Sequence, residues 1–151
     1  SVLAHSRDLL DDLMDVRRMF EPAVARVAAT RATDAEVAEL ERILRAQQRK
    51  LRAGQSAIAE DTAFHSALAH ATHNRVAVHI METLNDLLIE SRKLSMRQRG
   101  RPFRSIRGHA GVMAALRRRD PDSAARAMRD HIDQIADLFV QTWKPAPSKE
   151  T

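Results

Sequence analysis

The sequence predicts an all-α protein, an antiparallel bundle of about six helices. Apolar residues recur every three to four positions along almost the whole chain, which is the spacing of one face of an α-helix. Glycine is rare, with 4 residues in 151, and no stretch alternates between apolar and polar residues as a half-buried strand does. A chain of this length can bury about two thirds of its unfolded surface as one domain. We therefore expect residues 1–151 to form a single domain, with an ordered core over about residues 8–140.

The first two helices have identifiable ends. The first is expected from Arg7 to Thr30, and Pro22 should kink or split it because proline lacks a helical N–H. The second begins at Thr33, which forms a Thr-x-x-Glu capping box with Glu36, and it ends at Gly54. The apolar positions of the first are Leu9, Leu10, Leu13, Val16, Phe20, Val24 and Val27, and those of the second are Val37, Leu40, Leu44 and Leu51.

Four further helices follow. The third starts near Ser56 and ends by His73-Asn74, and the arginine-rich segment from Arg97 to Pro102 is expected to connect the fourth to the fifth. The fifth stops at Asp120-Pro121, where aspartate can cap and proline can occupy the first position of the sixth helix, which runs to about Trp143. The residues of the helical pattern in the fourth helix are Val76, Ile80, Leu84, Leu87 and Leu88. Those of the fifth helix are Ile106, Val112, Met113 and Leu116, and those of the sixth are Ala124, Met128, His131, Ile135 and Leu138. Residues 144–151 should form a disordered tail.

Composition excludes several classes of protein. The chain has no cysteine, which removes disulfides, iron-sulfur clusters and thiol catalysis and fits a reducing cytoplasm. No apolar run is long enough to span a bilayer and the N-terminus has no signal pattern, so we expect a soluble cytoplasmic protein without a membrane partner. The net charge of +5 comes from arginines clustered around expected helix ends, where cations are favourable, and only 3% of residues are aromatic. We interpret these arginines as helix-end residues rather than a DNA-binding surface.

Four side chains that bind metals well interrupt apolar helix faces. Asp61 and His65 lie one turn apart on the third helix, on the same side as Ile58 and Leu68, while His109 and His131 each interrupt a later apolar stripe. Burying such groups without partners costs on the order of a few kcal/mol each, and one divalent ion satisfies all four. The sequence therefore predicts a metal site. Its ligands would be Asp61, His65, His109 and His131, which suit zinc, nickel, manganese or iron equally. The other histidines, His5, His70, His73 and His79, are expected at the surface.

Two features have alternative interpretations. Arg17 and Arg18 either reach inward toward a carboxylate-bearing ligand or lie on an exposed face, paired with neighbouring acidic residues. Gly108 and Gly111 flank His109, although glycine within a helix costs roughly 1 kcal/mol relative to alanine. Either something approaches that backbone closely, or Gly108 marks a late start of the fifth helix.

A family resemblance extends over nearly everything from about Asp8 to Phe139. Four segments carry it: DVRRMFEPAVARVAA, EDTAFHSALAHATHN, the HAGVMAAL that starts at His109, and RRRDPDSAARAMRDHI. Together they resemble the effector-binding C-terminal domain of FadR-type regulators in the GntR family, called the FCD domain. The resemblance implies a helical bundle that forms a homodimer, holds a divalent metal and binds a small organic acid beside it. Metal-binding members use an Asp, a His four residues later and two further histidines, which match the four ligands named above. It also implies that Arg17 helps to bind the carboxylate of the acid.

The chain departs from the family pattern at two points. FadR-type regulators carry an N-terminal winged-helix DNA-binding domain, which these 151 residues do not supply, so DNA binding is expected only through that absent domain. Ala110 and Gly111 follow His109 where the family often has bulkier or charged residues, so the resemblance does not determine the shape of the pocket or the effector.

Two rival functions are compatible with the same ligand set. A metal-dependent helical-bundle hydrolase could use it to activate water, but the sequence has no evident general base beside the ligands, and neither Glu-x-x-His pairs nor His-Glu-x-x-His. We therefore expect no enzyme. A closed tetrahedral site would instead make the metal purely structural and the domain a dimerisation module.

Overall fold

The computed structural model describes residues 7–142, with side chains described as far as Leu138, and these residues form six helices and no strand. They are α2 (Arg7–Arg31), α3 (Asp34–Arg52), α4 (Ile58–His70), α5 (Arg75–Ser95), α6 (Arg101–Arg117) and α7 (Pro121–Thr142). The all-α prediction is confirmed. The expected tail and His5 lie outside the described residues. No described helix is both long enough and apolar enough to cross a membrane.

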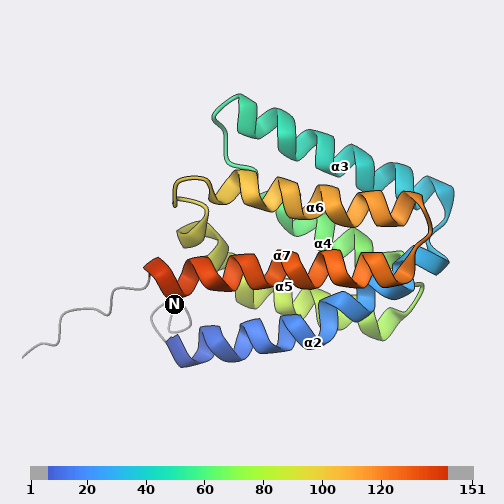
Figure 1. Ribbon diagram of the computed structural model, residues 1–151, viewed down its shortest axis with the longest axis horizontal. Helices are drawn as coiled ribbons and strands as arrows, with labels where there is room; N and C mark the ends of the chain where they lie inside the picture. Colours follow the sequence, from blue (N-terminus) through green and yellow to red (C-terminus); the bar gives the residue numbers. More distant parts are fainter. Residues whose placement is uncertain (1–6, 143–151) are drawn as a thin grey trace, which may run out of the picture.

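Successive helices reverse direction, which makes the bundle antiparallel (Figure 1). In Figure 1, α7 runs along the front of the molecule between α6 and α2, α3 lies along the outer side of α6, and α4 and α5 form the rear layer. The most extensive contacts are those of α7 with α2 and α6. The last helix therefore joins the first to the rest of the bundle.

Local signals set most of the helix ends. Thr33 and Glu36 form both hydrogen bonds of the capping box, and Gly54, just beyond α3, has a φ of 69° that glycine adopts without strain. Asn74 caps α5 by accepting from the N–H groups of Val76 and Ala77. The expected connection between α5 and α6 is shorter than predicted, because α6 already begins at Arg101 and takes Pro102 into its first turn.

The inner face of the first helix differs from its prediction. Of the kink or split expected at Pro22, the split does not occur, since α2 continues as one helix to Arg31. Leu9 and Val16, predicted to face inward, are exposed, and Arg17 and Glu21 are buried in their place. A pattern that counts only apolar residues scores both of these charged residues as solvent-facing.

The main core lies where α4, α6 and α7 meet. Phe64, Leu68, Leu116, Met128 and Ile132 are fully buried there. His65, His109 and His131 are buried in the same region, with at most 2% of each residue exposed. The apolar core therefore surrounds a polar centre.

Helix α5 leaves part of its apolar surface uncovered. Val76, Ile80, Leu87 and Leu94 are exposed, whereas Leu84 and Leu88 are buried. The four exposed residues are 4, 7 and 7 positions apart, which places them on one side of the helix. We call them the α5 stripe.

Candidate metal centre

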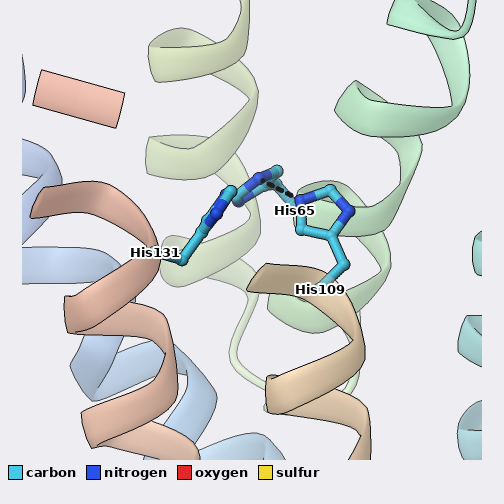
Figure 2. A group of neighbouring side chains, drawn as sticks. All are labelled: His65, His109 and His131. Atoms are coloured by element: carbon cyan, nitrogen blue, oxygen red, sulfur yellow. Dashed lines mark hydrogen bonds between the residues drawn. The ribbon is translucent and has the colours of Figure 1, made fainter. Parts of the chain in front are cut away.

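Three histidines from three helices meet in the centre of the bundle. One ring nitrogen from each of His65 on α4, His109 on α6 and His131 on α7 lies within 4.8 Å of the other two. Figure 2 shows the three side chains pointing toward one another. The Nε2 atoms of His65 and His109 are 3.2 Å apart. Imidazole nitrogens bound to one zinc ion lie about 2.1 Å from it, so two of them on the same ion lie about 3.0 to 3.4 Å apart.

The buried carboxylate of Glu21 fixes the ring of His65. Its Oε1 is hydrogen-bonded to His65 Nδ1 and its Oε2 accepts from Arg17 Nε. Burial raises the pKa of Glu21, but Arg17 and then His65 lower it by more, so the pKa lies well below its ordinary value. An ionised carboxylate only accepts hydrogen bonds, so His65 Nδ1 carries the proton that it donates. Nε2 is then the ring nitrogen of His65 that faces the other two histidines.

A second chain of hydrogen bonds fixes His109. The amide nitrogen of Gln47 donates to Asp61 Oδ2 over 3.4 Å and to Ser105 Oγ over 3.2 Å, and Ser105 Oγ in turn donates to Asp61. Because the Asp61 carboxylate accepts on this side, Gln47 presents its Oε1 to His109 Nδ1, at 2.9 Å. His109 therefore donates from Nδ1, and its Nε2 also faces the centre.

These two networks direct the Nε2 atoms of His65 and His109 toward each other. The Nδ1 atoms of the two rings are committed to Glu21 and Gln47, and the two Nε2 atoms lie 3.2 Å apart. In addition, His131 Nδ1 is buried without a hydrogen-bond partner. Apposed acceptors repel unless a proton or a metal ion lies between them. The arrangement fits a cation-binding site.

Asp61, the fourth predicted ligand, lies at the edge of this group. Its Oδ1 is 3.9 Å from His65 Nε2 and 3.6 Å from Arg92 Nε. Burial raises the pKa of Asp61, but His109 and then Arg92 lower it by more. The pKa of this carboxyl therefore lies well below its ordinary value. The structure thus brings Asp61 beside the three histidines, with one oxygen toward them and the other held by Ser105.

Burial keeps two of the imidazoles neutral. It lowers the pKa of His109 to about 3, although Asp61 acts in the opposite direction. Burial also lowers the pKa of His131 well below its ordinary value, and the neighbouring His109 and His65 add to that effect. Neutral imidazole is the form that binds metals.

Three buried arginines surround the centre. Arg17, Arg92 and Arg101 are each 2 to 3% exposed, and they outnumber the two buried carboxylates of Glu21 and Asp61. Arg92 donates from Nη1 to Thr62 and Asn85, but its Nη2 has no partner, and neither do Nε and Nη1 of Arg101. Burial lowers the pKa of Arg101 to about 10, so it remains charged at neutral pH. The centre therefore has an excess of buried positive charge with unused N–H donors.

The two possibilities for Arg17 and Arg18 are now distinguished. Arg17 reaches inward and is buried against Glu21, whereas Arg18 lies nearer the surface and pairs with Asp15 and Asp133. The structure also explains why a glycine stands at position 108, within helix α6. A Cβ built on Gly108 would lie 2.1 Å from His131 Nδ1, so the absence of a side chain makes room for that imidazole.

Several residues of the centre were not predicted from the sequence. They are Glu21, Gln47, Arg92, Arg101 and Ser105. One signal could have found two of them: Gln47 continues the apolar stripe of Leu40 and Leu44, and Arg92 follows Leu88 by one turn. This is the pattern that identified the histidines. The other predicted surface histidines of the described part, His70, His73 and His79, are indeed exposed.

Comparison with known proteins identifies the family. The FCD domain model matches residues 12–134, so the chain belongs to the FCD-domain family of GntR-type transcriptional regulators. It is 36% identical to the Glc operon transcriptional activator of Escherichia coli K12, over 83% of this chain and 53% of that protein. It is 33% identical to the HTH-type transcriptional repressor NanR of Enterobacter sp. strain 638, over 85% of this chain and 48% of that protein. The family is one of regulators and not of enzymes.

Solved structures agree with this assignment. A Streptococcus agalactiae GntR protein is 26% identical, with a TM-score of 0.73 over 83% of this chain and 57% of that one. E. coli McbR/YncC, at 20% identity, shares the fold, with a TM-score of 0.78 over 91% of this chain and 67% of that one. The chain spans about half the length of the curated relatives it matches.

The role of Gly108 can be tested with Gly111 as its matched control. Gly108→Ala should destabilise the domain by about 1 to 3 kcal/mol, because the new methyl group would overlap the His131 ring. Gly111→Ala should stabilise it by about 0.5 to 1 kcal/mol, because the nearest atom is 3.8 Å from the added Cβ and alanine favours the helix. Urea unfolding measures both. Equal effects of the two substitutions would show that the backbone of Gly108 does not accommodate His131.

The metal-free domain should lose stability as the pH falls below about 6.5. His109 and His131 have folded-state pKa values below the value near 6.5 of an unfolded chain, so the unfolded state takes up protons first. Each contributes up to about 1.4 kcal/mol per pH unit to the loss as the pH falls toward 3. Unfolding free energies at pH 6.5 and 5, above the range of most carboxylates, measure this. His109→Gln should reduce the slope, and a flat profile in the unsubstituted chain would contradict buried neutral imidazoles.

Proposed function

We propose that this chain is the effector-binding and dimerisation domain of a GntR-type regulator that binds a divalent metal and a small organic acid. A winged-helix domain of the whole protein would bind DNA, and the acid would modulate that binding. The observation that carries the proposal is the pair of apposed Nε2 atoms of His65 and His109, 3.2 Å apart among buried arginines with unused donors. The first feature calls for a cation and the second for an anion.

The metal would be held by Asp61, His65, His109 and His131. When bound, it would supply a Lewis acid that anchors a carboxylate. The protein's own contribution is to orient the ligands, since Glu21 and Gln47 hold the Nδ1 side of two rings. Such supporting partners typically contribute 10- to 100-fold to metal affinity.

The organic acid would be bound by the buried guanidinium groups. Arg92 and Arg101 have N–H groups without partners, and Arg17 lies on the same centre while donating to Glu21. Charged hydrogen bonds to a carboxylate would satisfy these donors. The excess of arginines also argues against a purely structural metal, because a closed metal site gives the unpaired guanidinium groups no anion.

Binding of the acid would connect helices that are far apart in the sequence. Its donors come from α2, α5 and the start of α6, while the metal ligands come from α4, α6 and α7. A ligand that bridges these helices stabilises one arrangement of the bundle over others. A coupling of about 1 to 3 kcal/mol is enough to change DNA affinity of the whole protein 5- to 150-fold. The two named relatives are an activator and a repressor, so either direction of control is compatible with this scheme.

We also propose that the α5 stripe is the homodimer surface. Its four apolar residues are exposed on one side of a 21-residue helix, which is a long apolar surface to leave in water. A twofold axis through it would pair the stripe with itself.

Removal of two histidines tests the metal centre. His109→Ala with His131→Ala should lower affinity for Co²⁺ or Zn²⁺ at least 100-fold and abolish binding of the acid. The exposed His70, on the same helix as His65, provides the control His70→Ala, which should change neither. Because the double variant also loses core volume, Glu21→Gln serves as a milder test, with metal affinity expected to fall about 10- to 100-fold. Normal acid binding by the double variant would overturn the mechanism.

Arg101 offers a test that separates function from stability. Arg101→Met removes a buried guanidinium with two unpaired nitrogens, so the domain should unfold no more easily, or be more stable by about 1 to 4 kcal/mol. Affinity for the acid should nevertheless fall about 10- to 100-fold. Calorimetry with mono-, di- and tricarboxylic acids on the metal-loaded domain measures this, with the exposed Arg104→Met as control. Loss of stability without loss of acid affinity would make Arg101 a structural residue.

Charged substitutions in the α5 stripe test the proposed dimer surface. The unsubstituted chain should be a dimer by light scattering at tens of micromolar, and Ile80→Glu with Leu87→Glu should make it a folded monomer. Phe103→Glu, at another exposed apolar residue, should leave the dimer intact. A dimer that survives the double substitution would place the interface elsewhere.

A further inference from the structure

A cavity of about 490 Å³ lies at one end of the bundle, outside the metal centre. It is bounded by the C-terminal ends of α3 and α5 and the N-terminal ends of α4 and α6, which lie together at the left of Figure 1. We call it the end cleft. Its apolar lining consists of Leu51, Ala57, Ile58, Met96, Pro102 and Ile106. Its volume is in the range of sites that bind small molecules, about 300 to 1,000 Å³.

The charges around the end cleft favour an anion. Lys93 and Arg97 line it and are exposed, and no carboxylate is among the twelve residues that line it. Lys93 Nζ also lies 3.5 Å from Glu90 Oε1, but an exposed ion pair of this kind contributes little to stability. Two helix N-terminal ends and two C-terminal ends border the cleft, so the helix dipoles oppose one another and the preference for an anion rests on Lys93 and Arg97.

The side chain of Gln47 links the end cleft to the metal centre by hydrogen bonds. Gln47 lines the cleft and is itself buried, and its amide group holds both His109 Nδ1 and Asp61. A molecule in the cleft would therefore contact the residue that orients two proposed metal ligands. Its presence would be transmitted to the centre through the hydrogen bonds of Gln47.

We propose that the end cleft is a second ligand site, which takes a small amphipathic anion such as a medium-chain carboxylate. The hydrocarbon part packs against Leu51, Ile58 and Ile106, and the acid group lies between Lys93 and Arg97. Occupancy alters the hydrogen bond from His109 to Gln47. This site is separate from the arginine-lined centre, and it can be tested without any metal.

Octanoate is the probe, with octanol as the uncharged comparison, and calorimetry on the metal-free 151-residue chain gives the affinities. Octanoate should bind at least tenfold more tightly than octanol. Ala57→Trp should fill the cleft and weaken octanoate at least tenfold, whereas Ala59→Trp, on the exposed side of the same helix, should not. Lys93→Gln with Arg97→Gln should weaken octanoate but not octanol.

Two measurements distinguish this site from the centre. Octanoate should shift the imidazole ¹⁵N resonances of His109 but not those of His70, and Arg101→Met should leave octanoate affinity unchanged. If Arg101→Met weakens octanoate and Ala57→Trp does not, the probe occupies the centre and the end cleft is not a ligand site. Equal affinity for octanoate and octanol, or no binding of octanoate, would also overturn the proposal. Unchanged His109 resonances on saturation would overturn the link through Gln47.

Discussion

The burial of two ionised carboxylates within the bundle determines the rest of the centre. Glu21 and Asp61 are each at most 2% exposed, and ions in such positions persist only when paired and hydrogen-bonded. Glu21 is paired with Arg17 and His65, and Asp61 is held by Ser105 and Gln47. Because carboxylates accept and never donate, they determine which nitrogen of each partner carries a proton. The two anions thus direct two imidazole Nε2 atoms toward one point.

This arrangement has a cost in stability that a purely structural core would avoid. Replacing buried ionic groups with apolar residues of similar volume is often neutral or stabilising. In this protein the polar centre lies beside Phe64, which stacks on the His109 ring with the ring centroids 4.2 Å apart. The surrounding apolar core keeps water away and holds the rings in position. Buried donors on Arg92 and Arg101 remain without partners, and the acid proposed above would satisfy them.

Six antiparallel helices are well suited to such a site because each contributes only one to three polar residues. The three histidines come from α4, α6 and α7, and the supporting Gln47 from α3. A ligand bound at the centre, as proposed above, would therefore contact residues of most helices at once. The end cleft touches the same network from outside through Gln47, so the two proposed ligands would share one hydrogen-bonded path.

Helical periodicity and capping signals were enough to predict the fold, all six helices and the inward position of Asp61, His65, His109 and His131. Those features are local: a repeat of three to four residues, a capping box or a proline at a helix start depends only on near neighbours in the chain. The partners of the histidines were decided by tertiary structure. Glu21 and His65 are 44 residues apart, and Gln47 and His109 are 62 apart. Which buried partner a polar residue meets depends on which helices pack together, and a periodic pattern does not identify that partner.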